Sequence, residues 1–119
     1  MSVGLRVLHF YKTSFPDTMG GAEQVIFQIA SGTAAQGIET TILSLTRDRN
    51  ATPLELEGVS VVRALQDFEF GSNAFSWRSF FAFRKLAARA DVIHFHFPWP
   101  FGDLVYLLSG IRKPAIVTY

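Results

Sequence analysis

The sequence predicts an α/β domain with three layers and a mostly parallel sheet. Short apolar runs rich in β-branched and aromatic residues alternate with two longer segments of helical periodicity. The resulting order, β-α-β-β-α-β-α-β, is typical of parallel strands joined by helices that cover both faces of a sheet. The strand segments are continuously apolar, as expected for strands buried on both faces. These observations indicate a single Rossmann-like domain over residues 1–119, because domains commonly contain about 100–200 residues.

The first half of the chain contains three predicted strands and one helix. Residues 5–10 form the first apolar run, and residues 22–36 have the periodicity of a helix. Gly37 stands where a helix commonly ends. Residues 40–45 and 59–62 are β-rich and predict the second and third strands. The helical periodicity rests on apolar positions at three- and four-residue spacing, namely Val25, Ile26, Ile29, Ala30 and Thr33.

The second half continues the alternation. Pro98 and Pro100 should end the fourth strand, because proline cannot donate a hydrogen bond to a ladder. The chain ends on a strand with no covering element, so we expect it to be part of a longer protein. The remaining elements are, in order, a polar connection at 47–57, a loop at 66–73, a helix at 75–90, a strand at 92–97, a short helix at 103–108 closed by Gly110, and a strand at 114–119.

Composition excludes several classes of function. Eleven basic and ten acidic residues leave a net charge of +1, whereas nucleic acid usually attracts a clearly basic domain, so we expect no nucleic-acid partner. The chain has no cysteine, which excludes disulfides, cysteine-based zinc sites and thiol nucleophiles within it. No apolar run approaches the ~20 residues of a membrane span, and the run at 7–11 does not resemble a signal peptide. We therefore expect a cytoplasmic protein.

Gly20 and Gly21 join the first strand to the first helix, at the edge of the sheet where α/β proteins bind ligands. Without side chains there, a ligand can approach the backbone closely. The free N–H groups of the first helical turn then favour an anion such as phosphate. The pattern is neither a G-x-G-x-x-G fingerprint nor a P-loop. From the residue types alone, a glycine pair that only permits a tight turn remains an alternative.

The glycine pair belongs to the first of five segments that together run over essentially the whole chain. They are F-P-D-T-M-G-G-A-E-Q-V-I at 15–26, Ile29-Ala30, Gly37-Ile38-Glu39, Asp91–His96, and 114–119. In this order they resemble the start of a family 4 glycosyltransferase of GT-B fold. One departure is Ile38, where the family often has histidine. The family's histidine after the last strand would follow Tyr119, and the carboxyl-terminal donor-binding domain is absent from the chain.

The resemblance implies a truncated half of a GT-B fold, the acceptor-side domain of a retaining, metal-independent glycosyltransferase. Such an enzyme moves a sugar from a nucleotide-sugar to a glycan or lipid-linked acceptor, here in bacterial surface polysaccharide assembly, and needs no cofactor. The backbone amides at Gly20 and Gly21 would contact the donor diphosphate. Lys12 and Asp17 would contact an acceptor phosphate and a sugar hydroxyl, or remain solvated loop charges. The domain by itself should be inactive. The alternative function is a stand-alone α/β module that binds a nucleotide or phosphate without catalysis.

The fourth strand contains an H-x-H pair, and side chains on a strand alternate between faces. His94 and His96 therefore share one face, and His9 lies late in the first strand. Three interpretations are open: buried histidines that bond to the backbone, a His96 that shapes the acceptor pocket, and a three-histidine metal site. We expect no metal ion at these residues. Trp99 in the next loop either stacks on an acceptor sugar or packs against the first loop.

The second helix has a basic and aromatic outer face. Arg78, Lys85 and Arg89 form one stripe, flanked by Trp77 and Phe81. A basic amphipathic helix of this kind is typical of contact with anionic lipid, which would place the protein at the inner face of the cell membrane. The alternatives are a solvated face and contact with the missing domain. The positions expected to face the sheet are Phe75, Phe80, Phe83, Leu86, Ala87 and Ala90.

Overall fold

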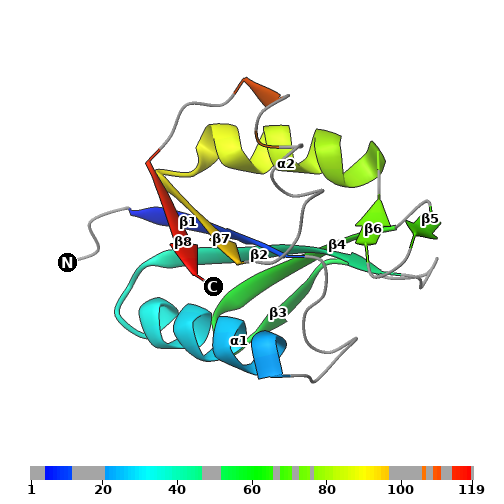
Figure 1. Ribbon diagram of the computed structural model, residues 1–119. Helices are drawn as coiled ribbons and strands as arrows, with labels where there is room; N and C mark the ends of the chain where they lie inside the picture. The colour runs from blue at the N-terminus through cyan, green and yellow to red at the C-terminus, as the bar shows by residue number, and fades with distance from the viewer. Residues whose placement is uncertain are drawn as a thin grey trace.

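A six-stranded sheet lies between two helices, α1 on one face and α2 on the other (Figure 1). The computed structural model describes residues 5–11, 21–46, 52–65, 68–70, 73–75, 77–96, 106, 109–110 and 114–118. Four of the five strand pairs in this sheet are parallel and one is antiparallel. The predicted Rossmann-like, mostly parallel architecture is therefore confirmed.

The elements follow the predicted alternation with additions. The helices are α1 at Gly21–Ala34 and α2 at Trp77–Arg89. The strands of the main sheet are β1 at Arg6–Phe10, β2 at Glu39–Thr46, β3 at Leu54–Leu56, β4 at Val59–Leu65, β7 at Val92–His96 and β8 at Ala115–Thr118. A separate two-stranded sheet is formed by β5 at Phe68–Phe70 and β6 at Asn73–Phe75.

The strand order is β3-β4-β2-β1-β7-β8, so β1 and β7 are neighbours in the middle of the sheet. The chain leaves β1 towards β2 and β4 on one side, and α2 then returns it to β7 on the other side. The direction of strand addition reverses between β1 and β7. In open α/β sheets this reversal marks the place, beyond the carboxyl ends of the strands, where ligands bind.

The pairing of β1 with β7 is fixed at its amino-terminal end. The backbone N–H of Arg6 donates to a carboxylate oxygen of Asp91 at 2.8 Å. The N–H of Asp91 donates to the carbonyl of Arg6 at 2.7 Å. With this end held, His9 stands opposite His94 and Phe10 opposite Phe95. A slip of one residue would send every side chain of β7 to the other face.

Aromatic packing fills the layer between the sheet and α2. Phe10 of β1 and Phe83 of α2 are fully buried, with ring centroids 4.9 Å apart. Phe95 of β7 lies 6.1 Å from Phe83. Because side chains alternate along a strand, this packing turns His9, His94 and His96 to the α1 side. There Ile26 and Ala30 of α1 are buried.

Two segments predicted as connections contain strands. The segment 47–57 includes β3, which pairs antiparallel with β4 through a two-residue turn. Glu57 and Gly58 both have positive φ, 50° and 81°, as the tight turns preferred in hairpins require. The segment 66–73 includes β5 and the start of β6. Phe75 lies in β6, so its predicted place on the sheet-facing side of the second helix is wrong.

The helices otherwise follow their apolar patterns. The buried face of α2 is confirmed for Phe83, Ala87 and Ala90, with Phe80 and Leu86 half-buried. In α1, Val25 is 46% exposed although it shares the apolar spacing, because Phe27 and Ala34 complete the buried face centred on Ile26 and Ala30. The α1 helix ends at Ala34, and Gly37 has φ of 89° as its predicted cap. In the predicted short helix at 103–108 only Tyr106 is described, and it is helical.

Replacement of Phe83 by alanine should destabilise this domain by about 3–5 kcal/mol, because the change leaves a cavity between two strands and a helix. Phe81→Ala is the matched control on the same helix, since Phe81 is 65% exposed, and it should change stability by less than about 0.5 kcal/mol. Native-state hydrogen exchange of the β1 amides measures both. Equal effects of the two substitutions would contradict this assignment of the core.

Candidate functional site

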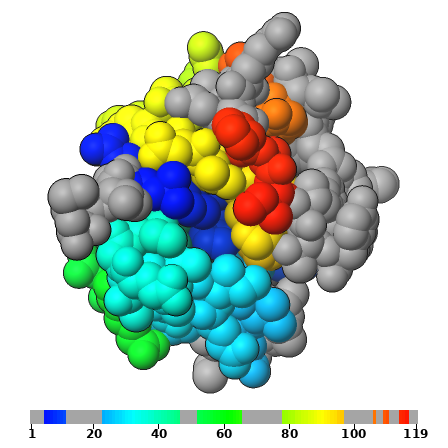
Figure 2. Space-filling model, turned by 90° about the vertical axis from the view of Figure 1, so that its left-hand side faces the viewer, coloured from blue at the N-terminus to red at the C-terminus, as the bar shows by residue number. Residues whose placement is uncertain are grey.

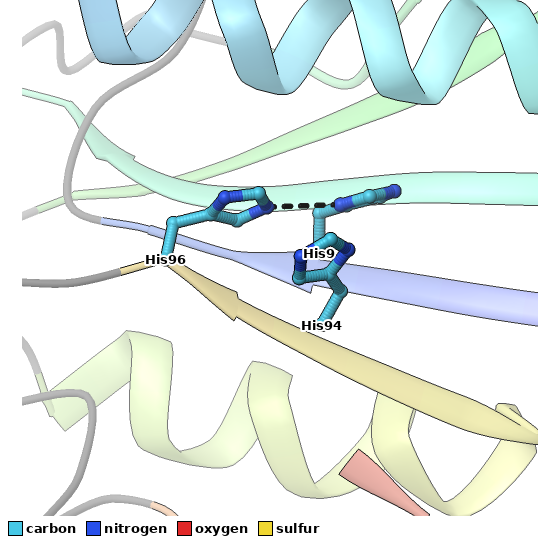
Figure 3. Close-up of side chains that lie close together, drawn as sticks. All are labelled: His9, His94 and His96. Carbon is cyan, nitrogen blue, oxygen red and sulfur yellow. Dashed lines mark hydrogen bonds between the residues drawn. The ribbon is translucent and has the colours of Figure 1, made fainter. Parts of the chain in front are cut away.

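Three histidines gather where β1 and β7 approach their carboxyl ends (Figure 3). His9 comes from β1, and His94 and His96 come from β7. Their side chains extend from the sheet towards α1. All three are buried, with 1%, 8% and 5% of their surface exposed. The site therefore lies at the reversal of strand order, under a helix that begins at the same edge of the sheet.

The rings are close enough to interact directly. Nδ1 of His9 lies 3.1 Å from Nε2 of His96, within hydrogen-bond distance. The rings of His94 and His96 stack with centroids 4.2 Å apart and an angle of 18° between their planes. His9 and His94 have centroids 4.9 Å apart. One nitrogen from each ring can be chosen so that all three atoms lie within 4.8 Å of one another.

The contact between His9 and His96 needs one proton on one of the two nitrogens. If His9 donates, its Nε2 is an acceptor; if His96 donates, Nε2 of His9 carries the proton. In both cases Nε2 of His9 is buried and has no hydrogen-bond partner within the described part of the chain. An unsatisfied buried polar group costs about 1–3 kcal/mol. The cluster thus retains a polar atom that neither tautomer satisfies.

Burial keeps these imidazoles neutral. Burial, and then the neighbouring rings of His94 and His96, lower the pKa of His9 from 6.5 to about 3. Burial, and then His94, lower the pKa of His96 to about 4. Burial also lowers the pKa of His94. At neutral pH all three rings therefore offer nitrogen lone pairs and N–H donors rather than positive charge.

Tyr11 connects the cluster to the first turn of α1. Its ring is buried and stands edge-on to His96, with centroids 6.4 Å apart. Burial, and then the carboxylate of Glu23, raise the pKa of Tyr11. Glu23 lies in the first turn of α1, so the beginning of this helix is near the carboxyl end of β1. The sequence pattern did not single out Tyr11, although its position directly after an apolar strand was the available signal.

The amino terminus of α1 is the second feature of this edge. The helix begins at Gly21, one residue before its predicted start. The first N–H groups of a helix have no partner within the helix, and its dipole favours an anion there. This end of α1 can therefore bind a phosphate if one reaches it. Gly20, the other member of the predicted pair, lies outside the described residues.

Among the predicted acceptor-binding residues, only His96 lies within the described part of the chain. It is buried at the carboxyl end of β7, as expected from the strand pattern. Lys12, Asp17 and Trp99 lie outside the described residues. The sequence placed His94 and His96 on one face, and the structure adds the direct contact between His96 and His9. Strand pairing creates this contact, and pairing cannot be read from either strand alone.

The predicted basic stripe lies on the outer face of α2. Arg78, Lys85 and Arg89 are exposed, and Phe81, at 65%, is the most exposed large apolar side chain among the described residues. Trp77 is the first residue of α2, and its side chain is not described. Within the described residues, no helix has the length and apolar character needed to cross a membrane.

A pocket of about 480 Å³ lies away from the histidines. It is lined from the α2 side of the sheet, near the amino ends of β1 and β2, by residues that include Leu86 and Arg89 of α2. Arg6 and Glu39 at its rim form an ion pair with 3.1 Å between Nε and Oε2. Because ligands of open α/β sheets bind at the carboxyl edge, the histidine edge is the stronger candidate.

Among the described strands, β8 is the last on its side of the sheet, and part of it is visible at the surface (Figure 2). Pro114, Ala115 and Ile116 are exposed, Ile116 by 52%. Ile116 stands directly beside His94 in the register of β7 and β8. The His94 side of the cluster thus lies one strand away from an exposed surface.

Comparison with known proteins gives consistent matches. Residues 19–119 match the model of a family described as Glycosyltransferase Family 4. Over 115 residues, the chain is 48% identical to the D-rhamnosyltransferase WbpZ of Pseudomonas aeruginosa. Over the same length it is 38% identical to O-antigen chain mannosyltransferase C of Escherichia coli. Both alignments cover 97% of this chain but only 30% and 31% of the relatives, so the chain spans about a third of their length.

Acidification from pH 7 to pH 5 should destabilise the domain. Each histidine has a lower pKa in the fold than in the unfolded chain, so the unfolded chain binds more protons below about pH 6.5. The free energy of unfolding should then fall by up to about 1.4 kcal/mol per pH unit for each histidine. Urea denaturation at several pH values, in the presence of a chelator, measures this slope.

The variant His96→Gln provides the control, because it removes one titrating group. It should reduce the slope of the free energy of unfolding against pH by up to about 1.4 kcal/mol per pH unit. Phe81→Ala should leave the slope unchanged, since this side chain is exposed on α2. A free energy of unfolding that stays constant from pH 7 to pH 5 would show that the histidines are not held neutral by the fold.

Proposed function

The chain belongs to Glycosyltransferase Family 4, and from this membership we propose that it is the acceptor-side domain of a glycosyltransferase with a GT-B fold. The complete enzyme transfers a sugar from a nucleotide-sugar to a glycan or lipid-linked acceptor in the assembly of a bacterial surface polysaccharide. Two relatives named as a rhamnosyltransferase and an O-antigen mannosyltransferase support this proposal. Because the chain covers only about a third of these relatives, we expect the domain by itself to be inactive.

The donor diphosphate meets this domain at the start of α1. The observation that carries this part of the proposal is that α1 begins at Gly21, on the residue pair predicted to bind phosphate. The first amides of a helix have no partner within the helix itself, and glycine carries no side chain that would obstruct an approach to them. The amides at Gly20 and Gly21 bind the leaving phosphate more strongly as its negative charge develops.

This arrangement supports transfer without a metal ion at the diphosphate. Fixed backbone donors and a helix dipole stabilise the same charge that a divalent cation would neutralise. We further propose that the enzyme retains the anomeric configuration of the donor sugar, as its family resemblance implies.

The acceptor binds beside the carboxyl ends of β1 and β7. His96 shapes this pocket. Its neutral imidazole can donate a hydrogen bond to a sugar hydroxyl or accept one from it. In the loops that follow the two strands, Lys12 and Asp17 contact an acceptor phosphate and a sugar hydroxyl, and Trp99 stacks on a sugar ring. Contact between His9 and His96 holds the latter ring in place.

The outer face of α2 brings the enzyme to the cytoplasmic side of the membrane. Three exposed basic residues, Arg78, Lys85 and Arg89, lie on one face of the helix, and the exposed ring of Phe81 lies next to them. Basic side chains attract anionic headgroups, and an exposed aromatic ring can enter the interface. Trp77, at the start of the same helix, adds a second aromatic residue. This location suits a lipid-linked acceptor.

The substitution Gly21→Pro should lower kcat of the complete enzyme by about 10²-fold or more. Proline at the first helical position is compatible with the helix but removes its N–H, and loss of one such donor typically has an effect of this size. Steady-state kinetics with a nucleotide-sugar that supports turnover measures the change.

Gly32→Ala is the matched control, because a Cβ at Gly32 meets nothing within 4 Å and alanine is favourable inside a helix. It should leave kcat unchanged. Turnover of Gly21→Pro at the normal rate, with α1 intact by circular dichroism, would contradict the phosphate role of this helix end.

Replacement of Arg78, Lys85 and Arg89 together by glutamine should lower binding to vesicles that contain anionic lipid by at least about tenfold, because each basic residue near such a surface contributes about 1 kcal/mol. Vesicle sedimentation of the complete protein measures the partition. Neutral phosphatidylcholine vesicles and Phe81→Ser separate the charge effect from the aromatic one. Equal binding of the triple variant and the natural protein would refute membrane contact through α2.

A further inference from the structure

We propose that His9, His94 and His96 form a binding site for a divalent transition-metal ion of the zinc class. The inference rests on the convergence of three buried imidazoles from two neighbouring strands (Figure 3). It does not involve the donor diphosphate, but it shares His96 with the proposed acceptor pocket. The site would join β1 to β7 at the carboxyl edge of the sheet, where the chain places all of its histidines.

The spacing of the nitrogens suits one ion. Two imidazole nitrogens bound to a tetrahedral zinc ion at about 2.0–2.1 Å lie about 3.4 Å apart. Nδ1 of His9 and Nε2 of His96 are 3.1 Å apart, and one nitrogen from each of the three rings can be chosen so that all lie within 4.8 Å of one another. Small rotations of the side chains would bring the three atoms to the distances that one ion requires. A water molecule would take the fourth position, as in sites with three protein ligands.

The protonation state of the rings also suits a metal. A histidine binds a metal through a neutral imidazole nitrogen, and burial lowers the pKa of all three residues. No proton has to be displaced from a charged ring at neutral pH. A bound ion would also replace the single hydrogen bond between His9 and His96 by bonds to both nitrogens.

The donor set selects the kind of ion. Three imidazole nitrogens favour Zn²⁺, Ni²⁺ or Cu²⁺, whereas Mg²⁺, Ca²⁺ and Mn²⁺ prefer oxygen ligands. The site is therefore unsuited to the magnesium or manganese ion that could bridge a diphosphate. Zinc binding here and metal-independent transfer at the donor diphosphate are compatible, since they involve different atoms.

An ion can reach the cluster from the β8 side. His94 is the most exposed of the three, and its register partner on β8 is Ile116, which is 52% exposed. In the described part of the chain, the cluster is thus separated from the surface by one edge strand. A path of this kind is one of the requirements for a metal site.

The test uses the complete protein without a polyhistidine tag, after treatment with a chelator. Competition with a chromophoric zinc chelator gives the dissociation constant for Zn²⁺, and Mg²⁺ serves as the comparison ion. We expect binding of one zinc ion that raises the Tm of the protein, because an ion that binds only the fold stabilises it. Mg²⁺ should leave the Tm unchanged.

Substitution assigns the ion to these residues. His9→Gln, His94→Gln and His96→Gln should each weaken Zn²⁺ binding by at least about tenfold. Tyr11→Phe is the matched control at the same edge, since it keeps the ring beside His96 and changes no imidazole. Unchanged zinc affinity in the three glutamine variants would overturn the proposal.

A measurement on the natural protein decides the question even if the variants fail to fold. Crystals soaked with Zn²⁺ and measured at the zinc absorption edge should show an anomalous peak between the three rings. Absence of a peak there overturns the proposal, whether or not zinc binds elsewhere. Neither result changes the expected loss of turnover in Gly21→Pro, so failure of the zinc site can be distinguished from failure of the proposed enzyme.

Discussion

The parallel pairing of β1 with β7 is the constraint on which the rest of the structure depends. These strands are more than 80 residues apart in sequence, since the pair Arg6 and Asp91 is separated by 85 positions. Their register brings Phe10 and Phe95 to the α2 side and all three histidines to the α1 side. The same pairing forms the core and the candidate site. A shift of register would therefore remove both, because the period of a strand is two residues.

Burial gives the site its chemical character. A histidine in water is partly charged near neutral pH, but burial, and then the neighbouring ring of His94, lower the pKa of both His9 and His96 and keep them neutral. Neutral rings can donate and accept hydrogen bonds or bind a metal through a lone pair. This property fits the proposed binding of sugar hydroxyls beside His96. In the same proposal, the amide groups at the start of α1 bind the negative charge of the donor.

Much of the fold could be predicted from local patterns, and the misses have physical reasons. Continuous apolar runs identified β1, β2, β7 and β8, and the glycine pair placed the start of α1 to within one residue. The hairpin of β3 and β4 was missed because its turn uses Glu57, a non-glycine residue with positive φ, in place of a typical turn sequence. The sequence predicts a loop at Phe68 and a helix at Phe75, whereas both lie in strands. Strands of three residues are too short to show the two-residue alternation of apolar and polar side chains. The contact of His9 with His96 required knowledge of which strands pair.

The central claim is that the carboxyl edge of β1 and β7, with the start of α1, is the working edge of a glycosyltransferase domain. The most direct test is hydrogen exchange of the complete protein with and without each common nucleoside diphosphate. The nucleotide that binds should slow exchange at the first amides of α1, from Gly21 to Glu23, and leave the last turn of that helix, near Ala34, unchanged. A nucleotide that binds tightly without any change at Gly21–Glu23 would contradict the account.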